Sequence, residues 1–391
     1  MRDVVIVSAA RTAVGSFGGT LKDVPAVELG AITIEEVVKR AGISPDMVDW
    51  VIMGAASADG MGEVPARNAA LKAGIPEDVP AMFVSAACTS GLFGVTMGAR
   101  MIKMGEADVV AAGGMESMSA YPYLLYGVRW GLRFRDATLV DGCSLALECP
   151  VNHVQMGQYG DEVAEEEGVS RQEQDEWALR SQKRWAEANE AGRFKEEIVP
   201  VEVPRRKGEP IIFELDEFPR PDSTLEGLAR LKPVFREGGT VTAGNAPGIN
   251  DGAASVLLIS GEKAEELGKE PLGTILSWAT AAGPPKNIPI VPSQVIEKAV
   301  KEAGLNLGEI DLFEINEAFA AVPVISIKRL GIDPDKVNVD GGSVAQGHPV
   351  GSTGVRILTH LLYELKRRGG GLGVAALCGV GSQGEAVVVR V

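Results

Sequence analysis

Apolar runs and helix-like patterns alternate along the first third of the chain. Val4–Ser8, Val48–Met53 and Asp108–Ala112 are short and almost continuously apolar, which is typical of buried strands. Ala26–Ala41 and Leu92–Met104 lie between them and carry apolar residues at helical spacing. Buried strands separated by helices favour a parallel sheet that helices cover on both faces. The pattern therefore predicts an α/β fold.

The last third of the chain repeats this pattern at an offset of about 262 positions. Gly273–Trp278 predicts a strand and Val295–Ala303 predicts a helix. Three segments have counterparts in the same order: 43–53 with 305–315, 90–104 with 352–366, and 109–113 with 374–379. We therefore expect two structurally similar halves, each with a mixed, mostly parallel sheet covered by helices.

The middle of the chain has a different character, with most of the tryptophans and several charge runs. Ser170 and Glu173 form a capping box, and the helix predicted after them carries Trp177 and Trp185 at helical spacing. We interpret this tryptophan stripe as core packing. The predicted division is an N-terminal half of residues 1–118 with 246–268, an inserted loop domain of residues 119–245, and a C-terminal half of residues 269–391.

The formal net charge is −15, from 53 acidic and 38 basic residues. Because binding to phosphate backbones needs a basic surface, this charge argues against nucleic acid as a partner. The short basic cluster Arg205-Arg206-Lys207 is either a solvated turn or a contact for one anionic ligand, and the residues leave both open. The four cysteines lack CxxC spacing, so no metal site is expected.

The N-terminal segment Met1–Val7 is polar and then strand-like, without the apolar stretch of a signal peptide. No stretch approaches the roughly 20 apolar residues of a membrane span. We therefore expect a soluble cytoplasmic protein with no membrane partner, whose cysteines stay free thiols. Cys143 and Cys149 are interpreted as small buried hydrophobic residues.

Cys88 lies between a short apolar strand and a predicted helix, in the segment Val84–Gly91. The free N–H groups and the positive dipole at a helix N-terminus favour the thiolate form of a cysteine. Small residues on both sides leave room for a substrate. The position indicates a nucleophile.

His348 lies in the glycine-rich segment Asp340–Gly354, which opens another predicted helix. Such a loop indicates positive φ or close backbone approach, neither of which a core-filling histidine needs. The repeat places His348 almost opposite Cys88, and a cysteine with a histidine is a standard activation pair. His360, on the predicted helix, is interpreted as structural.

Two further polar residues follow predicted strands. Cys378 ends the strand Val374–Leu377 and precedes a glycine turn, a pattern that often marks a site at a strand end. Asn316 follows the strand Leu312–Ile315. Its side chain can orient a water or polarise a carbonyl, or it can cap the next helix, and the residues alone leave both open.

Taken together, the motifs of this chain resemble those of the thiolase family over essentially its whole length. The matching segments are Arg11-Thr12 with Gly15, Ala112–Met118, Gly244-Asn245-Ala246 with Gly248–Ala254, Asn316–Ala320, Gly347-His348-Pro349 and Cys378-Gly379. The resemblance implies a duplicated thiolase-like fold with an inserted loop domain. It also implies coenzyme A (CoA) as a substrate, with no bound cofactor.

The resemblance implies a role for each candidate residue. Cys88 would be the acylated nucleophile, His348 its base, and Cys378 the group that moves a proton to and from the substrate α-carbon. Asn316 would hold a water that forms, with His348, an oxyanion hole for the enolate. The backbone N–H groups of Cys88 and Val380 would form a second hole, as preorganised donors do for developing oxyanions.

The middle segment resembles the part of the family fold that covers CoA, and an arginine there suits phosphate contact. The positions expected to contact CoA or the acyl group are Met156, Arg220, Ser223, Thr224, Phe235, Ala243, Pro247, Ala318 and Phe319.

Several residues depart from the family pattern near the expected site: Ser85, Gln155, Pro247, Asp340, Gln346 and Val380. A non-glycine residue at position 380 is expected to be strained. These departures, with the stretch Asp141–Gln155, lead to the hypothesis that the acyl substrate is not simple acetoacetyl-CoA. A longer, branched, aryl or carboxylated 3-oxoacyl group would fit a reshaped pocket.

Three other classes of protein are alternatives. A decarboxylating ketosynthase would not need Cys378 or the loop domain, and a nicotinamide dehydrogenase would need a GxGxxG segment after the first strand. A CoA-binding subunit that has lost catalysis or needs an accessory subunit stays open. The family resemblance also implies a homodimer or homotetramer.

Overall fold

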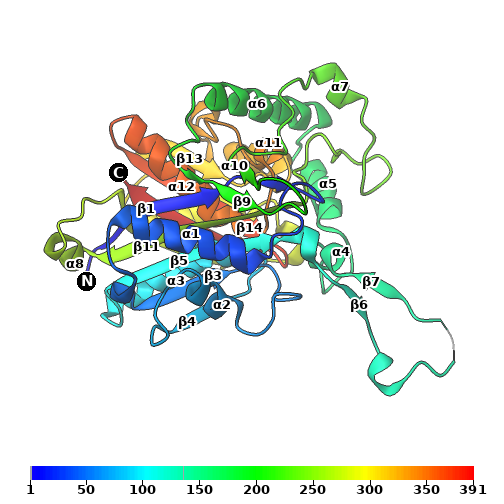
Figure 1. Cartoon of the computed structure of the whole chain (residues 1–391). Helices are drawn as coiled ribbons and strands as arrows, with labels where there is room; N and C mark the ends of the chain where they lie inside the picture. Colours follow the sequence, from blue (N-terminus) through cyan, green and yellow to red (C-terminus); the bar gives the residue numbers. More distant parts are fainter. Residues whose placement is uncertain (1, 135) are drawn as a thin grey trace.

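The fold is described from a computed structural model, which covers residues 2–134 and 136–391. Its centre is one continuous mixed sheet in the order β13-β14-β15-β12-β1-β11-β5-β3-β4 (Figure 1). The strands are β1 (Val4–Thr12), β3 (Trp50–Gly54), β4 (Ala81–Val84), β5 (Val109–Ser117), β11 (Asn250–Ser260), β12 (Gly273–Ala282), β13 (Leu312–Ile315), β14 (Leu372–Gly379) and β15 (Gln383–Arg390).

The two halves of this sheet have the same strand order, which confirms the predicted duplication. From the centre outward, the N-terminal half runs β1-β11-β5-β3-β4 and the C-terminal half runs β12-β15-β14-β13. Beyond β13, Phe313 forms a parallel bridge with Val337 at the place that β4 takes in the other half. The halves join where β1 pairs antiparallel with β12, through Val5 with Thr274 and Ile6 with Gly273.

Within this strand order, the parallel pairs involve outer strands: β3 with β4, β3 with β5, and β13 with β14. The short strand β8 (Ile198–Val199) also pairs parallel with β1. The central pairs are antiparallel, and β11 runs against both of its neighbours although every residue in it is buried. The expected excess of parallel pairs is therefore not found. A continuous apolar run indicates that a strand is buried on both faces, but it carries no information on the direction of the strand.

The helices α3 (Ser90–Met104) and α12 (Thr353–Arg367) occupy equivalent places in the two halves and pack on each other. Each also contacts strands of the opposite half. Their contact is close, since Gly91 N donates to Gly351 O at 3.0 Å and a Cβ added to Gly114 would lie 2.2 Å from the same oxygen. The loop before α12 is thereby held against the start of α3.

The other helices cover the sheet or form the middle segment. The covering helices are α1 (Ala26–Ala41), α2 (Pro65–Lys72), α8 (Gly261–Glu266), α9 (Val291–Glu302), α10 (Ala321–Leu330) and α11 (Ser343–Gln346). The middle segment holds α4 (Gly142–Ala146), α5 (Met156–Glu166), α6 (Arg171–Glu190) and α7 (Leu225–Ala229). The short strands are β2 (Gly15–Ser16), β6 (Tyr123–Leu125), β7 (Leu139–Asp141), β8 (Ile198–Val199), β9 (Val201–Val203) and β10 (Ile211–Phe213).

Helix α6 begins at the predicted capping box, where Ser170 Oγ accepts from Glu173 N and Glu173 Oε2 accepts from Ser170 N at 2.7 Å. Trp177 and Trp185 are buried, as the core-packing interpretation required. The exact boundaries of the three units stay a prediction.

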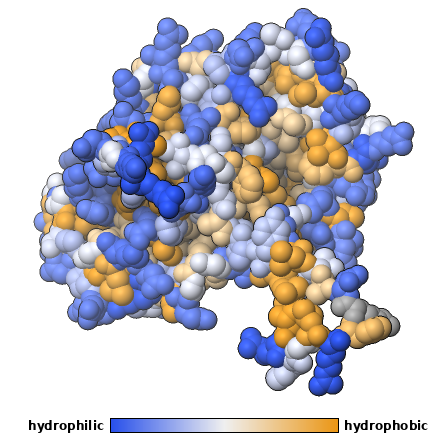
Figure 2. Space-filling view, turned by 45° about the vertical axis from the view of Figure 1, so that its right-hand side comes forward, coloured by the Kyte–Doolittle hydropathy of each residue, from blue (hydrophilic) through white to orange (hydrophobic). Residues whose placement is uncertain are grey.

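The β6–β7 hairpin projects from the body of the molecule (Figure 1). Trp130 is 84% exposed and Phe134 is 90% exposed, and Tyr123, Tyr126, Leu132 and Leu139 are also exposed. Figure 2 shows hydrophobic residues gathered along the projection. Large exposed apolar patches of this kind mark interaction surfaces.

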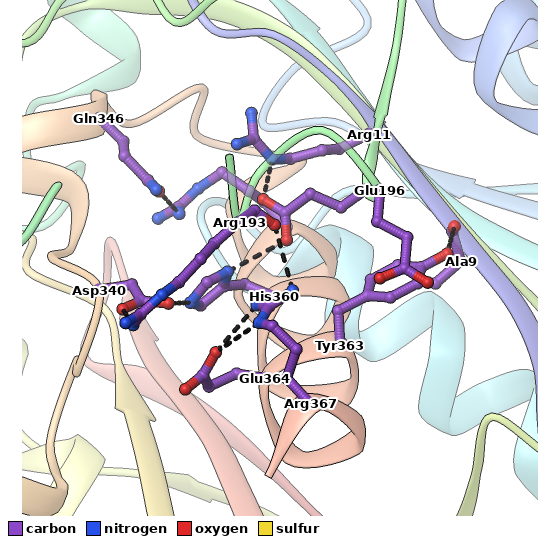
Figure 3. Close-up of polar contacts among 12 residues, drawn as sticks. Ala9, Arg11, Arg193, Glu196, Asp340, Gln346, His360, Tyr363, Glu364 and Arg367 are labelled. Atoms are coloured by element: carbon purple, nitrogen blue, oxygen red, sulfur yellow. Dashed lines mark hydrogen bonds and ion pairs between the residues drawn. The ribbon is translucent and has the colours of Figure 1, made fainter. Parts of the chain in front are cut away.

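A buried network of charged residues ties the middle segment to both halves (Figure 3). Arg11 of β1 pairs with Glu197 at 2.7 Å, and His360 of α12 pairs with Glu197 at 3.1 Å and with Asp340 at 3.3 Å. Arg193 also pairs with Asp340. Burial alone would lower the pKa of His360, but the two carboxylates raise it to about 10, so this histidine is a buried cation.

No helix within residues 2–134 and 136–391 is long and apolar enough to cross a membrane.

Candidate active site

Cys88 sits in a tight turn between the edge strand β4 and helix α3. The residue before it, Ala87, has a φ of 52°, which is a strained conformation for a residue with a side chain. Ser90 holds the turn, because its Oγ accepts from Ala86 N at 2.8 Å and donates to Ala87 O at 2.6 Å. The sequence therefore builds a fixed bend that presents Cys88 at the start of the helix.

The thiol of Cys88 is neutral in the resting protein, contrary to the expected thiolate. Burial raises its pKa to about 12, while the backbone N–H groups of Val380 and of Cys88 itself act in the opposite direction. Desolvation outweighs these backbone donors and the helix N-terminus because the side chain is 6% exposed and no cation neighbours it in the part of the chain described. A nucleophilic role therefore requires a base.

His348 is held as a neutral base with its Nε2 free to accept a proton. Its Nδ1 lies 2.7 Å from Thr353 Oγ1, and that hydroxyl donates to Pro349 O at 2.9 Å. The Thr353 oxygen must then accept from Nδ1–H, which leaves the lone pair on Nε2. Burial, helped by the charge of Arg356, lowers the pKa of His348 to about 3.

The backbone of the histidine loop is fixed by Asn250. Its Oδ1 accepts from His348 N at 2.9 Å, and its Nδ2 donates to Gly15 O at 2.9 Å. Gly347 has a φ of 99°, and a Cβ there would lie 2.5 Å from the Asn250 amide carbon, so glycine is required on both grounds.

Asn316 points at His348 and does not cap a helix. Its Nδ2 lies 3.5 Å from His348 Nε2, and its Oδ1 accepts from Ser343 Oγ at 2.6 Å. Helix α10 starts after Ala320 without a side-chain cap, so the capping alternative is wrong. The amide presents an N–H donor beside the imidazole.

Cys378 lies at the end of β14 and is fully buried. It is close enough to Cys88 that a charge on Cys88 affects the pKa of Cys378. Burial, and then the charge of Cys88, raise the pKa of Cys378. The next residue, Gly379, packs on the nucleophile turn, since a Cβ there would lie 3.3 Å from Cys88 N. The expected strain at Val380 is not found, because the positive φ values in this turn belong to Gly381 and Ser382.

A cavity of about 370 Å³ is lined by Cys88, His348 and Val380. The predicted substrate contacts Met156, Phe235, Pro247, Ala318 and Phe319 line the same cavity. Phe235 and Phe319 meet edge to face at 6.3 Å and form part of its wall. Asn316 and Cys378 are not among the lining residues: Asn316 lies beside His348, and Cys378 lies near Cys88.

Part of the cavity wall was not predicted residue by residue. It comprises Phe17, Met118, Asp141, Cys143, Ser144, Leu147, Gln155, Gly157, Ala246, Gly248, Ile249, Ile288 and Val350. Five of these fall in the stretch Asp141–Gln155, whose departure from the family pattern was the available signal. Cys143 is buried as expected, but it also forms part of the wall.

A second cavity, of about 280 Å³, is lined by the other predicted CoA contacts: Arg220, Ser223, Thr224 and Ala243. The segment 243–248 reaches both cavities, since Ala243 and Gly244 line one and Ala246 and Pro247 line the other. The basic cluster Arg205-Arg206-Lys207 is exposed and lines neither of them. No group of residues suited to hold a metal occurs among those described.

Glu116 holds two loops of the site in place, and the sequence did not identify it as a site residue. Its Oε2 accepts from Ala56 N at 2.9 Å and from Gly351 N at 2.8 Å, so one carboxylate holds a loop from each half. Burial raises its pKa to about 7. Asn250, Ser343 and Thr353 were likewise missed, because their roles depend on contacts that local patterns do not carry.

Comparison with known proteins agrees with this arrangement. Residues 4–262 match the family model for the thiolase N-terminal domain and residues 269–391 match that for the thiolase C-terminal domain. The chain belongs to the thiolase family.

Similar relatives include an acetyl-CoA acetyltransferase of Cupriavidus necator, 49% identical over 391 residues with both chains fully covered. Another, from Chromobacterium violaceum, is 47% identical over 99% of each chain. The crystal structure of Bacillus anthracis acetyl-CoA acetyltransferase has a TM-score of 0.97 at 43% identity, covering 100% of this chain and 99% of that one. Human mitochondrial 3-ketoacyl-CoA thiolase in complex with CoA has a TM-score of 0.96 at 39% identity, covering 100% and 98%.

The protein is therefore an acyltransferase enzyme of the thiolase class, and it uses CoA as a substrate.

Proposed function

We propose that the enzyme cleaves a 3-oxoacyl-CoA with CoA, giving a shortened acyl-CoA and a second thioester such as acetyl-CoA, through an acyl-enzyme on Cys88. The reverse reaction is the Claisen condensation. The observation that carries the proposal is the joint placement of Cys88, His348 and the Val380 N–H around one cavity, with Cys378 and Asn316 next to them.

In the first step, His348 Nε2 takes the proton of the Cys88 thiol and the sulfur attacks the 3-oxo carbon. The N–H groups of Cys88 and Val380 stabilise the oxyanion that forms there. The carbon–carbon bond then breaks, and the departing enolate is held by His348 and by a water on Asn316. Cys378 donates a proton to the enolate carbon, which releases the first thioester.

In the second step, CoA transfers its thiol proton to the Cys378 thiolate and attacks the acyl-enzyme carbonyl. The tetrahedral intermediate collapses, the Cys88 sulfur leaves and takes back its proton from His348, and the shortened acyl-CoA is released. Cys88 acts as the nucleophile and Cys378 transfers protons to and from carbon. Two thiols with different roles need different surroundings, because the surroundings set their pKa values. Arg220, Ser223 and Thr224 would contact CoA in the second cavity, the arginine through a phosphate.

For the acyl group, we propose a longer, branched, aryl or carboxylated 3-oxoacyl substrate in place of simple acetoacetyl-CoA. Support comes from the unusual wall that Asp141, Cys143 and Leu147 contribute. The described lining has no lysine or arginine, which favours the uncharged members of this set. The names of the bacterial relatives favour the opposite result, acetoacetyl-CoA, so kcat/KM across a substrate panel decides between them.

The test of the reaction is intact-mass spectrometry after incubation with a panel of 3-oxoacyl-CoA thioesters without free CoA. We expect an acyl adduct on the wild type and none on Cys88→Ala, and the mass of the adduct identifies the accepted group. A folded wild type that takes up no acyl group from any member of the panel would contradict the proposal and favour a partner-dependent CoA-binding subunit.

We also propose that the enzyme is a homodimer or homotetramer. Two surfaces support self-association: the apolar β6–β7 projection, and the edge strand β4, whose outer backbone groups are unpaired in the described chain. Light scattering of the eluting protein should give a mass of two or four chains, and Trp130→Ser with Phe134→Ser should lower it if the projection carries the contact. A monomer at micromolar concentration would contradict this proposal.

The reducing cytoplasm is the compartment we propose for this enzyme, because a reaction through two thiols requires both to stay reduced. Cell fractionation with an antibody against the protein tests the location.

A further inference from the structure

Arg356 is a buried cation without a carboxylate partner. It is 2% exposed, on helix α12, and its guanidinium donates to two neutral acceptors, Gln346 Oε1 and Ser343 Oγ, the latter at 2.8 Å. Its Nε has no hydrogen-bond partner and no carboxylate forms an ion pair with it within the described ranges. Figure 3 shows Gln346 with the dashed line that marks its bond to the guanidinium. Burying a charge without an ionic partner costs free energy of folding, so stability alone does not account for this arginine.

The guanidinium is connected to the site by one line of hydrogen bonds. Ser343 Oγ accepts from Arg356 and donates to Asn316 Oδ1 at 2.6 Å, and Asn316 Nδ2 then lies 3.5 Å from His348 Nε2. Because Arg356 has only donors, the serine hydrogen must point to Asn316. This fixes the asparagine amide with its N–H toward His348 and its oxygen toward Ser343.

We propose that Arg356 and Ser343 are positioning residues for the oxyanion hole: Ser343 sets the orientation of the Asn316 amide, and Arg356 supplies an unneutralised positive charge behind it. The inference rests on the proposed function, in which Asn316 and His348 hold the enolate. A donor polarised by a buried cation binds a developing anion more strongly, because charge-assisted hydrogen bonds are stronger and the surroundings are of low dielectric.

Neighbouring acidic groups leave this positive charge largely uncompensated. Glu197 and Asp216 are paired with Arg11. Glu314, on β13, is buried, and burial raises its pKa to about 8 against the charges of His360 and Arg356, which disfavours its ionised form. The charge of Arg356 also contributes, after burial, to the lowered pKa of His348, which keeps the imidazole neutral and able to accept a proton.

The proposal separates two reactions of the same enzyme. Thiolysis of a 3-oxoacyl-CoA breaks a carbon–carbon bond and passes through the enolate. Exchange of labelled CoA into a saturated acyl-CoA passes only through the acyl-enzyme and forms no enolate. Removing the positioning residues should therefore slow thiolysis more than exchange.

The experiment measures both rates for the wild type, Ser343→Ala, Arg356→Met and the matched control Ser326→Ala. Ser326 is a buried serine of α10 whose Oγ donates only to Val322 O in the described structure. For Ser343→Ala and Arg356→Met, we expect kcat of thiolysis to fall roughly tenfold more than kcat of exchange. This effect is smaller than the roughly 100-fold or greater loss of kcat that follows removal of an oxyanion donor itself. The control should keep the wild-type ratio.

Thermal unfolding adds a readout that distinguishes positioning from support of the fold. Replacement of a buried unpaired charge by methionine should not lower the Tm, whereas it should lower thiolysis. Equal losses in both reactions, or an unchanged ratio in Ser343→Ala, would overturn the inference even if Arg356→Met does not fold. A wild type that exchanges CoA but performs no thiolysis would instead overturn the proposed function.

Discussion

The resting pair of Cys88 and His348 consists of a neutral thiol and a neutral imidazole. Burial raises the pKa of Cys88 to about 12 and lowers that of His348 to about 3, so proton transfer between them is unfavourable before substrate arrives. A buried ion pair would need compensating donors for both charges. The thiolate is thus expected to form only as the sulfur attacks, when the negative charge passes to an oxyanion that backbone N–H groups can hold.

Thr353 is predicted to select the catalytic tautomer of His348. Thr353→Val removes the acceptor of Nδ1–H while keeping the shape of the side chain, so the proton can move to Nε2 and block the base. We expect kcat/KM to fall by roughly tenfold or more, and Thr353→Ser to retain most of the activity. Wild-type activity in the valine variant would show that the tautomer is set by another contact.

At the scale of elements, the crossing of α3 with the loop before α12 brings the two halves of the site together. Its closeness depends on glycine, because a Cβ at Gly114 would lie 2.2 Å from Gly351 O and 2.7 Å from Ser352 Cα. Both are main-chain atoms and cannot turn aside as a flexible side chain does.

Gly114→Ala is therefore predicted to destabilise the fold by about 2–3 kcal/mol and to lower activity, because overpacking would push the His348 loop away from Cys88. The matched control is Gly308→Ala, where no atom lies within 4 Å of the added carbon. Urea unfolding of both variants checks the prediction, and equal stability for the two would contradict it.

The elements themselves were largely predictable from the sequence. Strands β1 and β3 and helices α1, α3 and α6 follow from the spacing of apolar residues and from the capping box at Ser170. Strand direction was not predictable, since β11 is buried throughout and yet antiparallel to both neighbours. The site motifs were recognised, but Asn250, Ser343 and Thr353 were not, because each acts on a residue reached only through the fold.

At the scale of the molecule, the network around His360 joins β1, the middle segment and α12. The pKa of His360 is raised from 6.5 to about 10, so its stabilising contribution is fully present below pH 6.5 and is lost as the pH rises through about 10. The pKa of Glu197 is instead lowered from 4.5 to about 2 by Arg11 and His360 against the effect of burial, so its contribution is present above pH 4.5 and lost as the pH falls through about 2.

We therefore predict that His360→Gln lowers the free energy of unfolding most near pH 6 and progressively less toward pH 10. The measurement is urea unfolding of wild type and variant at several pH values, with His153→Gln as a control at an exposed histidine. A stability difference that stays constant between pH 6 and 10 would show that His360 is not a buried cation.

The sequence alone determined the local properties of this enzyme: which segments are apolar, where a helix begins, that the chain is duplicated, and which motifs resemble thiolases. Only the tertiary structure decided that β1 pairs with β12 to join the halves, that Asp141, Cys143 and Leu147 line one cavity with Cys88 and His348, and that burial disfavours the Cys88 thiolate. The physical reason is the same in each case. Strand pairing, cavity shape and desolvation are set by atoms distant in the chain, and a local pattern of residues carries no record of them.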